Sequence, residues 1–159
     1  MLKISKLTDY AIIILRHIVI NQKSKYSAAN LAEEIKLNVP TVSKLLKLLA
    51  KAGILFSSRG VEGGYTLNKE AKDITVLEIS CAIDGMFGLT DCCNDKKEDC
   101  KNQNICPLVN KWQILSDLFQ DVLGSISLQD IIFIDSKPEF YKLVSNKLSQ
   151  ENSKKVVIL

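Results

Sequence analysis

Three cysteines in one short polar segment are the residues of this chain best suited to chemistry. They follow the spacing Cys93-x6-Cys100-x5-Cys106, and Cys92 beside Cys93 adds a fourth thiol. Thiolates are favoured ligands of zinc and of iron–sulfur clusters. The segment 90–105 has almost no apolar side chains to hold it, so a metal or a cross-link would be needed to order it. The sequence therefore predicts a soft-metal site in this loop.

The spacing leaves the nature of this site open. Three thiolates do not close a soft-metal site, so a fourth ligand must come from elsewhere. Zinc usually takes a CxxC pair, which the loop lacks, although zinc stays an alternative to a cluster. A disulfide formed under oxidative stress is a third interpretation. A redox enzyme with Cys92 or Cys93 as nucleophile is disfavoured, because neither a histidine nor a CxxC motif accompanies the thiols.

Predicted helices flank the loop on both sides. Thr75-x-x-Glu78 has the pattern of a capping box and begins a helix of about ten residues. Cys81 falls within that helix, where a lone cysteine is more often a small core residue than a ligand. Pro107 opens the next helix and places Cys106 near its N-terminus, where the helix dipole stabilises the thiolate that binds metal.

The helix expected from about 107 to 125 carries an apolar seam of the heptad type. The seam consists of Leu108, Trp112, Leu115, Phe119, Val122 and Ile126. Such a seam predicts a dimer interface, and packing on the preceding helix is the alternative for a second face. Beyond it, residues 135–159 are rich in Lys and Ser and predict a flexible tail.

The first 70 residues have the pattern of a helix-turn-helix domain. Apolar residues at helical spacing predict a helix over about 6–21, and Ser27 is a plausible N-cap for a short second helix. A tight turn follows, and Pro40 suits the first turn of a third helix. The apolar face of that third helix consists of Val42, Leu45, Leu46 and Leu49. Its open face is polar and basic, as in a recognition helix.

Two short strands, 54–57 and 65–67, follow the third helix and enclose a glycine-rich turn. Strands around such a turn after a helix-turn-helix predict a wing. Arg59 is placed to enter a minor groove. Gly63 and Gly64 permit a tight tip that can approach a phosphate backbone.

Charge and composition agree with a protein that binds a polyanion. Residues 1–70 carry 11 Lys and Arg against 5 Asp and Glu, a net of +6, whereas residues 71–159 carry 10 against 13, a net of −3. The basic first half suits nucleic acid, although charge for solubility alone is the alternative. No apolar run approaches the ~20 residues of a membrane span, and no signal-peptide pattern is present, so we expect a cytoplasmic protein with reduced thiols.

Together these motifs resemble the Rrf2 family of bacterial winged-helix regulators, and within it the SUF-type iron–sulfur assembly regulators. The segments that carry the resemblance are 2–11, 40–47, 59–65, 89–92, and Cys106 with Trp112-Gln113. The resemblance runs from residue 1 to about 131. It implies a mainly α fold, with a winged helix-turn-helix over 1–70 and a cysteine loop and dimerisation helix over 71–134, and the expected tail over 135–159 lies beyond it. It also implies a homodimer that binds double-stranded operator DNA as a repressor rather than an enzyme.

The resemblance also assigns the predicted contacts with DNA. It places the recognition helix of the family on the segment around residue 40 and the wing on Arg59. The residues that we expect at the DNA are Pro40, Thr41, Ser43, Lys44, Lys47, Arg59, Gly63 and Gly64.

The resemblance further implies an iron–sulfur cluster, with [2Fe-2S] favoured over [4Fe-4S]. Cys100 and Cys106 match two of its ligands, and the third is Cys92 or Cys93. The Leu-Thr-Asp-Cys match favours Cys92, whereas the spacing of the loop favours Cys93. A nitric-oxide- or redox-responsive regulator of the same family, and a zinc-stabilised DNA-binding protein without a sensing role, are the alternative functions.

The fourth ligand departs from one version of the family pattern. Some members have a histidine three residues after the last cysteine, and Val109 occupies that position here. The single histidine, His17, falls in the first helix and is interpreted as structural. Other members recruit a carboxylate from the first helix of the partner subunit, and Asp9 matches that position. We therefore expect Asp9 as the fourth ligand, with a plain surface or helix-start charge as the alternative.

Overall fold

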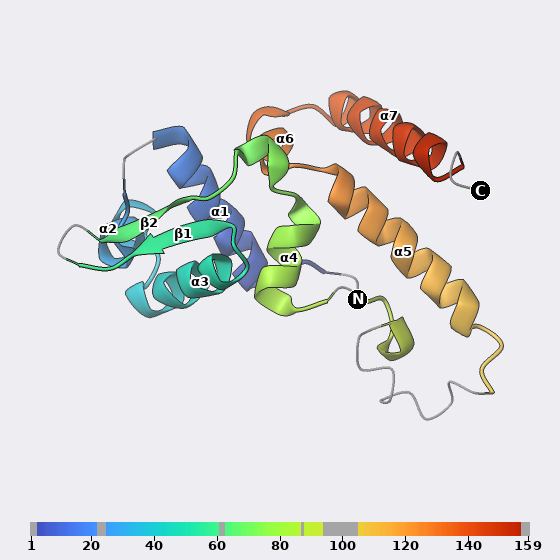
Figure 1. The fold of residues 1–159 in the computed structure, drawn as a ribbon, viewed down its shortest axis with the longest axis horizontal. Helices are drawn as coiled ribbons and strands as arrows, with labels where there is room; N and C mark the ends of the chain where they lie inside the picture. The colour runs from blue at the N-terminus through green and yellow to red at the C-terminus, as the bar shows by residue number, and fades with distance from the viewer. Residues whose placement is uncertain (1–2, 22–24, 61–62, 87, 94–104, 157–159) are drawn as a thin grey trace.

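A computed structural model describes residues 3–21, 25–60, 63–86, 88–93 and 105–156 (Figure 1). The elements are α1 (Lys6–Asn21), α2 (Ala28–Glu34), α3 (Val39–Lys51), β1 (Leu55–Ser58), β2 (Gly64–Leu67), the 3₁₀ helix η1 (Ala71–Asp73), α4 (Val76–Asp84), the 3₁₀ helix η2 (Asp91–Cys93), α5 (Val109–Ser125), α6 (Leu128–Phe133) and α7 (Lys137–Val156). The predicted mainly α fold with a two-stranded wing is confirmed. Within these ranges, no helix is long and apolar enough to cross a bilayer.

Helix α3 has its buried face where the sequence predicts it. Val42, Leu45, Leu46 and Leu49 are all completely buried in the core formed with α1 and α2. The helix begins after Asn38, whose side-chain oxygen accepts a hydrogen bond from the N–H of Thr41 at 2.9 Å. This bond satisfies one N–H that the first turn of a helix leaves without a backbone partner.

The wing is attached to the helical core through Tyr26. Strands β1 and β2 pair antiparallel, from Leu55 with Leu67 to Ser58 with Gly64. Tyr26, which is 1% exposed, exchanges two backbone hydrogen bonds with Tyr65, at 3.1 and 2.9 Å. The segment before α2 thus forms an isolated antiparallel β-bridge with β2. Ser27 caps α2 as predicted, accepting from the N–H of Asn30 at 3.1 Å.

Two short backbone segments join the helices of the second half to the winged helix. The N–H of Val76 donates to the carbonyl of Ile126 at 2.9 Å, and the N–H of Leu128 donates to the carbonyl of Ile74 at 2.7 Å. Ile74 and Leu128 are both fully buried in the same core as α3. The junction between α5 and α6 is therefore part of the DNA-binding half of the fold.

The predicted cap at Thr75 is confirmed in one of its two halves. Thr75 Oγ1 accepts from the N–H of Glu78 at 3.1 Å and starts α4. The Glu78 carboxylate pairs with the Lys69 ammonium that follows the wing. A full reciprocal capping box occurs instead at α6, between Ser127 and Asp130.

Residues 137–156 form helix α7, where we had predicted a flexible tail over 135–159. Phe140, Leu143, Val144 and Leu148 recur at helical spacing, are half-buried, and lie on the side of α7 that packs against α5. Figure 1 shows the two helices side by side. The sequence does not predict this helix, because its short apolar stripe is diluted by Lys and Ser and gains its stability from a tertiary contact.

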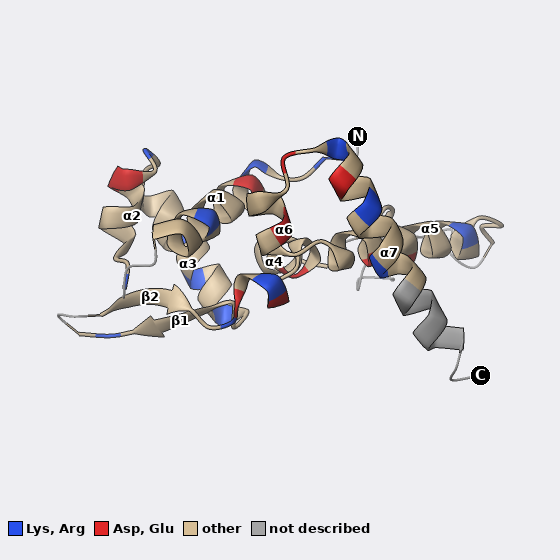
Figure 2. Ribbon diagram, turned by 90° about the horizontal axis from the view of Figure 1, so that it is seen from above, with Lys and Arg blue, Asp and Glu red and all other residues tan. Residues whose placement is uncertain are grey.

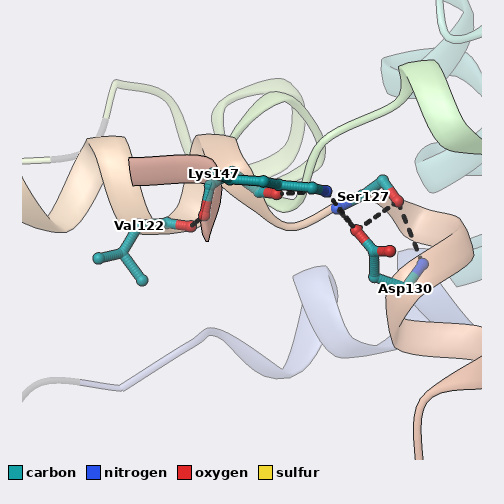
Figure 3. Close-up of polar contacts among 5 residues, drawn as sticks. Val122, Ser127, Asp130 and Lys147 are labelled. Carbon is teal, nitrogen blue, oxygen red and sulfur yellow. Dashed lines mark hydrogen bonds and ion pairs between the residues drawn. The ribbon is translucent and has the colours of Figure 1, made fainter. Parts of the chain in front are cut away.

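That contact is made by Lys147, which reaches the junction between α5 and α6 (Figure 3). Its ammonium donates to the Ser125 carbonyl and to Asp130 Oδ2, each at 2.8 Å. Ser127 also donates to Asp130 Oδ2, from its backbone N–H at 2.9 Å and its hydroxyl at 2.7 Å. Burial alone would raise the pKa of Asp130, but the bonds from Lys147 and Ser127 outweigh it and lower that pKa.

We predict that Lys147→Met lowers the free energy of unfolding by about 1 kcal/mol at pH 7, because a part-buried ion pair and a hydrogen bond are lost. The depressed pKa of Asp130 stabilises the fold above the ordinary carboxyl range of about 4, and this contribution disappears as the pH falls through the lower folded value. The difference between variant and wild type should therefore shrink in acid.

Urea unfolding followed by circular dichroism at several pH values measures both effects. Lys142→Met is the matched control, since Lys142 is an exposed lysine of the same helix. Equal destabilisation by the two substitutions, or a difference that persists in acid, would contradict the assignment.

Candidate DNA-binding surface and cysteine site

The open face of α3 bears the polar and basic residues that we predicted at the DNA. Lys44 and Lys47 are exposed, and Thr41 and Ser43 are half-buried beside them. Pro40 is exposed in the first turn of the helix. Figure 2 shows the Lys and Arg positions spread along α3. A helix supported from behind by a fully apolar face and lined in front by ammonium groups can enter a major groove and contact phosphates beside it.

The wing extends from the same domain and has an exposed arginine directly after its first strand. Arg59 is exposed at the end of β1, and Gly60 follows it with φ at +109°. This φ favours glycine because L side chains rarely adopt it. Gly60 thus makes the turn of the wing, a structural role that the sequence interpretation did not assign to it.

Gly63 and Gly64 are required by packing within the wing, which is a different reason from the one we predicted. A Cβ at Gly63 would lie 2.5 Å from the Ser58 carbonyl oxygen. A Cβ at Gly64 would lie 2.9 Å from the carbonyl oxygen of Tyr26. These glycines let the hairpin close and let β2 lie against the segment before α2. Their predicted approach to phosphate stays a prediction.

Cys92 and Cys93 lie on η2 and face a common hydroxyl. Thr90 Oγ1 is 3.1 Å from Cys92 Sγ and 3.2 Å from Cys93 Sγ. The N–H of Cys93 donates to the Thr90 carbonyl at 2.9 Å and closes the turn. Cys92 is only 7% exposed, whereas Cys93 is half-buried. A hydroxyl has one proton, so Thr90 can donate to only one of the two sulfurs at a time.

Cys106 lies three residues before α5 and is half-buried, and η2 packs against α5. The thiol segments on both sides of the loop thus meet the same helix. Cys100, the remaining predicted ligand, lies outside the described residues. Cys81 is half-buried on α4, which agrees only in part with its interpretation as a core residue.

The other predicted ligands lie elsewhere on the chain. Asp9 is exposed in the first turn of α1. His17 pairs with the Glu34 carboxylate and meets the ring of Tyr26 edge-on, which agrees with a structural role. Among the described residues no three His, Cys, Asp or Glu side chains lie close enough to hold a metal ion. One chain therefore does not bring Asp9 to its own described thiols.

An apolar strip of α5 and the segment before it lies open to solvent beside the cysteine site. Trp112 and Leu115 of the predicted seam are each 39% exposed and Leu108 is 44% exposed, and Ile114 and Leu118 on the neighbouring face are more exposed still. Phe119 and Val122, further along the seam, are half-buried. An open strip of this kind indicates an interaction surface.

Comparison with known proteins identifies the family. Residues 4–133 match the Rrf2 family, described as iron-dependent transcriptional regulators. The chain belongs to the Rrf2 family. It is thus a DNA-binding transcriptional regulator, as its winged helix predicts, and the predicted resemblance is confirmed.

Relatives of the chain are regulators of the same kind. The HTH-type transcriptional regulator IscR of Vibrio cholerae is 27% identical over 87% of this chain and 82% of its own length. IscR of Photorhabdus laumondii is 31% identical over 70% of this chain and 67% of its length. Among solved structures, T. potens IscR superposes with a TM-score of 0.61, at 25% identity, over 86% of this chain and 90% of that chain.

CymR, the global cysteine regulator of B. subtilis, is equally similar in fold, with a TM-score of 0.61 at 25% identity. The superposition covers 86% of this chain and all of that one. Two differently named Rrf2-type regulators, IscR and the global cysteine regulator CymR, therefore share this fold. The signal of this chain must be argued from its own cysteine loop.

We predict that Gly64→Ala destabilises the protein by about 1–3 kcal/mol, the usual cost of forcing an extra methyl group into a packed site. The new Cβ would press on the Tyr26 carbonyl and break the pairing of Tyr26 with Tyr65. Thermal melts measure the effect. Ser57→Ala, on an exposed position of β1, is the control and should change little. Equal stability of the two variants would show that the wing is not packed as described.

Proposed function

We propose that this regulator controls iron–sulfur assembly genes, and that an iron–sulfur cluster on its cysteine loop sets its affinity for operator DNA. The observation that carries the proposal is the packing of the thiol-bearing η2 on α5. The far end of α5 is hydrogen-bonded into the core of the winged helix through Ile126 and Leu128. A change at the thiols thus has a continuous packed route to the DNA-binding residues.

Cys92, Cys100 and Cys106 are the thiols that we propose as ligands. Cys92 is buried on η2, the 3₁₀ helix that packs against α5, and Cys106 lies just before that helix, so both belong to the same end of α5. Cys93 is the more exposed of the adjacent pair and is the alternative ligand to Cys92. A cluster on these thiols would tie the two sides of the loop into one unit, and its loss would free them. We favour [2Fe-2S], with [4Fe-4S] as the alternative.

The fourth ligand is proposed to come from a second copy of the chain. Asp9 is exposed on α1, and among the described residues it does not join the thiols of its own chain. A carboxylate that is free on the surface is available to a partner. The resemblance to SUF-type regulators implies that a carboxylate of the partner's first helix is a ligand, and Asp9 occupies that position.

A homodimer is also supported by the open strip on α5. Trp112 and Leu115 would be covered by the same strip of a second copy, which makes a two-fold interface. Two recognition helices held in this way would reach half-sites about one helical turn apart, roughly 34 Å. Dimerisation thereby sets the spacing of the operator.

The proposed control works through the order of the loop. With the thiols linked, η2 and the start of α5 are held together, and the two winged helices have a fixed separation. With the thiols free, the loop relaxes and the population of dimers that match the operator shifts. Couplings of this type are typically about 1–3 kcal/mol, so affinity would change roughly five- to 150-fold.

We predict that Lys44→Ala weakens operator binding by about tenfold, with a smaller salt dependence if Lys44 contacts a phosphate. The operator is first selected from random duplex DNA with the wild-type protein, and binding is then titrated at several salt concentrations. Lys142→Ala on α7 is the matched control and should bind as wild type. Wild-type affinity in the Lys44 variant would remove α3 from the interface.

We predict that anaerobic reconstitution with ferrous iron and sulfide gives a coloured protein whose spectrum identifies the cluster type. Cys92→Ser, Cys100→Ser and Cys106→Ser should each lose iron and sulfide, whereas Cys93→Ser should retain them. Asp9→Ala should shorten the lifetime of the cluster without changing the thermal melt. A colourless protein with one equivalent of zinc would instead establish the zinc-stabilised alternative.

A further inference from the structure

The last residue of α4 is a carboxylate in a position that a helix alone disfavours. Asp84 ends α4, where the carbonyl end of the helix dipole repels negative charge. Gly85 follows with φ at +89° and turns the chain out of the helix toward the cysteine loop. The carboxylate therefore stands at the point where the loop begins, and its stabilisation must come from another element.

That element is the first turn of α1. Ser5 Oγ donates to Asp84 Oδ1 at 2.8 Å, and Thr8 Oγ1 donates to Asp84 Oδ2 at 2.6 Å. Each carboxylate oxygen thus has its own donor from α1. The Thr8 side chain is completely buried, and Ser5 Oγ also accepts the N–H of Thr8 at 3.0 Å, which caps the start of α1. The N-terminal end of α1 favours the negative charge that the end of α4 does not.

The network has two consequences for the cysteine site. It fixes the start of the loop that leads from Gly85 to Cys92. It also fixes the turn of α1 that carries Asp9, because Asp9 follows Thr8 directly. Asp84 thereby orients both the start of the loop that carries the thiols and Asp9, the proposed ligand for the partner's cluster. It does so through hydrogen bonds to α1, a helix of the DNA-binding domain.

We infer that Asp84 is a positioning residue that couples the cysteine loop to the DNA-binding domain through Ser5 and Thr8. The inference rests on the proposed control of operator affinity by the loop. When the thiols are linked, the loop holds Asp84 at α1 and the first turn of α1 is ordered. When they are free, the movement of Gly85 and the residues after it reaches α1 through the same two bonds.

A role in stability alone is the alternative, and the two roles differ in what they change. A residue needed only for folding affects DNA binding equally with and without the cluster. A coupling residue changes the ratio of the two affinities. The ratio is therefore the deciding readout, whichever state of the protein binds DNA more tightly.

The test uses Asp84→Asn in the full-length protein. The amide keeps the shape of the side chain, but it can accept a hydrogen bond through only one of its two terminal atoms, so one of the two hydroxyl groups loses its acceptor. Operator affinity is titrated for the metal-free protein and for the protein reconstituted with iron and sulfide. We expect metal-free affinity within about twofold of wild type, and a ratio of the two affinities at least about fivefold closer to one.

A second readout does not depend on the cluster or on DNA. Hydrogen exchange of metal-free protein should become about fivefold faster over residues 5–12 in Asp84→Asn, because the turn loses an anchor. Asp135→Asn, at an exposed carboxylate between α6 and α7, is the matched control. Thr8→Val removes one bond from the α1 side, keeps the buried volume, and should reproduce both effects.

The outcomes separate the inference from the function on which it rests. An unchanged affinity ratio in Asp84→Asn, with a clear ratio in wild type, overturns the coupling role and leaves the proposed function intact. An equal loss of affinity in both states together with a lower melting temperature assigns Asp84 to stability alone and also overturns it. If wild type itself binds equally with and without the cluster, the proposed function fails and the inference fails with it.

Discussion

The structure depends on two backbone hydrogen bonds that join the segment before α4 to the junction of α5 and α6. They run from Val76 to Ile126 and from Leu128 to Ile74. Since Ile74 and Leu128 are fully buried among the residues of the winged helix, these bonds cannot exchange with water without opening the core. The C-terminal end of the long helix α5 is therefore held against the DNA-binding half, although most of its length lies outside that half.

Helix α4 is held at both ends by bonds of different kinds. Its start is fixed by the buried backbone pairing, and its end is fixed by Asp84 at the surface of α1. Nine residues of α-helix span about 14 Å, so α4 is a short rigid strut between the two anchors. The anchor at the start of α4 is fully buried, whereas at its end Asp84 is exposed and only its partner Thr8 is buried. This asymmetry suits a helix whose far end changes with the state of a loop.

Local patterns predicted much of the fold because local interactions determine it. The buried face of α3 and the caps at Ser27 and Thr75 follow from side chains within one or two turns. Helix α7 could not be predicted in the same way, because Lys147 finds its partners in Ser125 and Asp130, about twenty residues earlier in the sequence.

In the candidate site too, features set by nearby residues could be predicted from the sequence, whereas those set by distant residues could not. Spacing identified the thiols, but the orientation of Cys92 and Cys93 toward Thr90 is set by the 3₁₀ turn and could not be derived from spacing. The packing role of Gly64 likewise depends on Tyr26, almost forty residues away. The role of Asp84 could not be predicted from the sequence, because its partners Ser5 and Thr8 lie 79 and 76 residues earlier in the chain.

The exposed Trp112 gives the protein an optical property of its own. It is the single tryptophan of the chain, and it lies on α5 within the open apolar strip, six residues after Cys106. Indole emission shifts to shorter wavelength when the ring leaves water, and an iron–sulfur chromophore nearby would quench it by energy transfer. The emission wavelength of Trp112 can thus report the association of two chains, and its emission intensity can report whether a cluster is bound to the thiols.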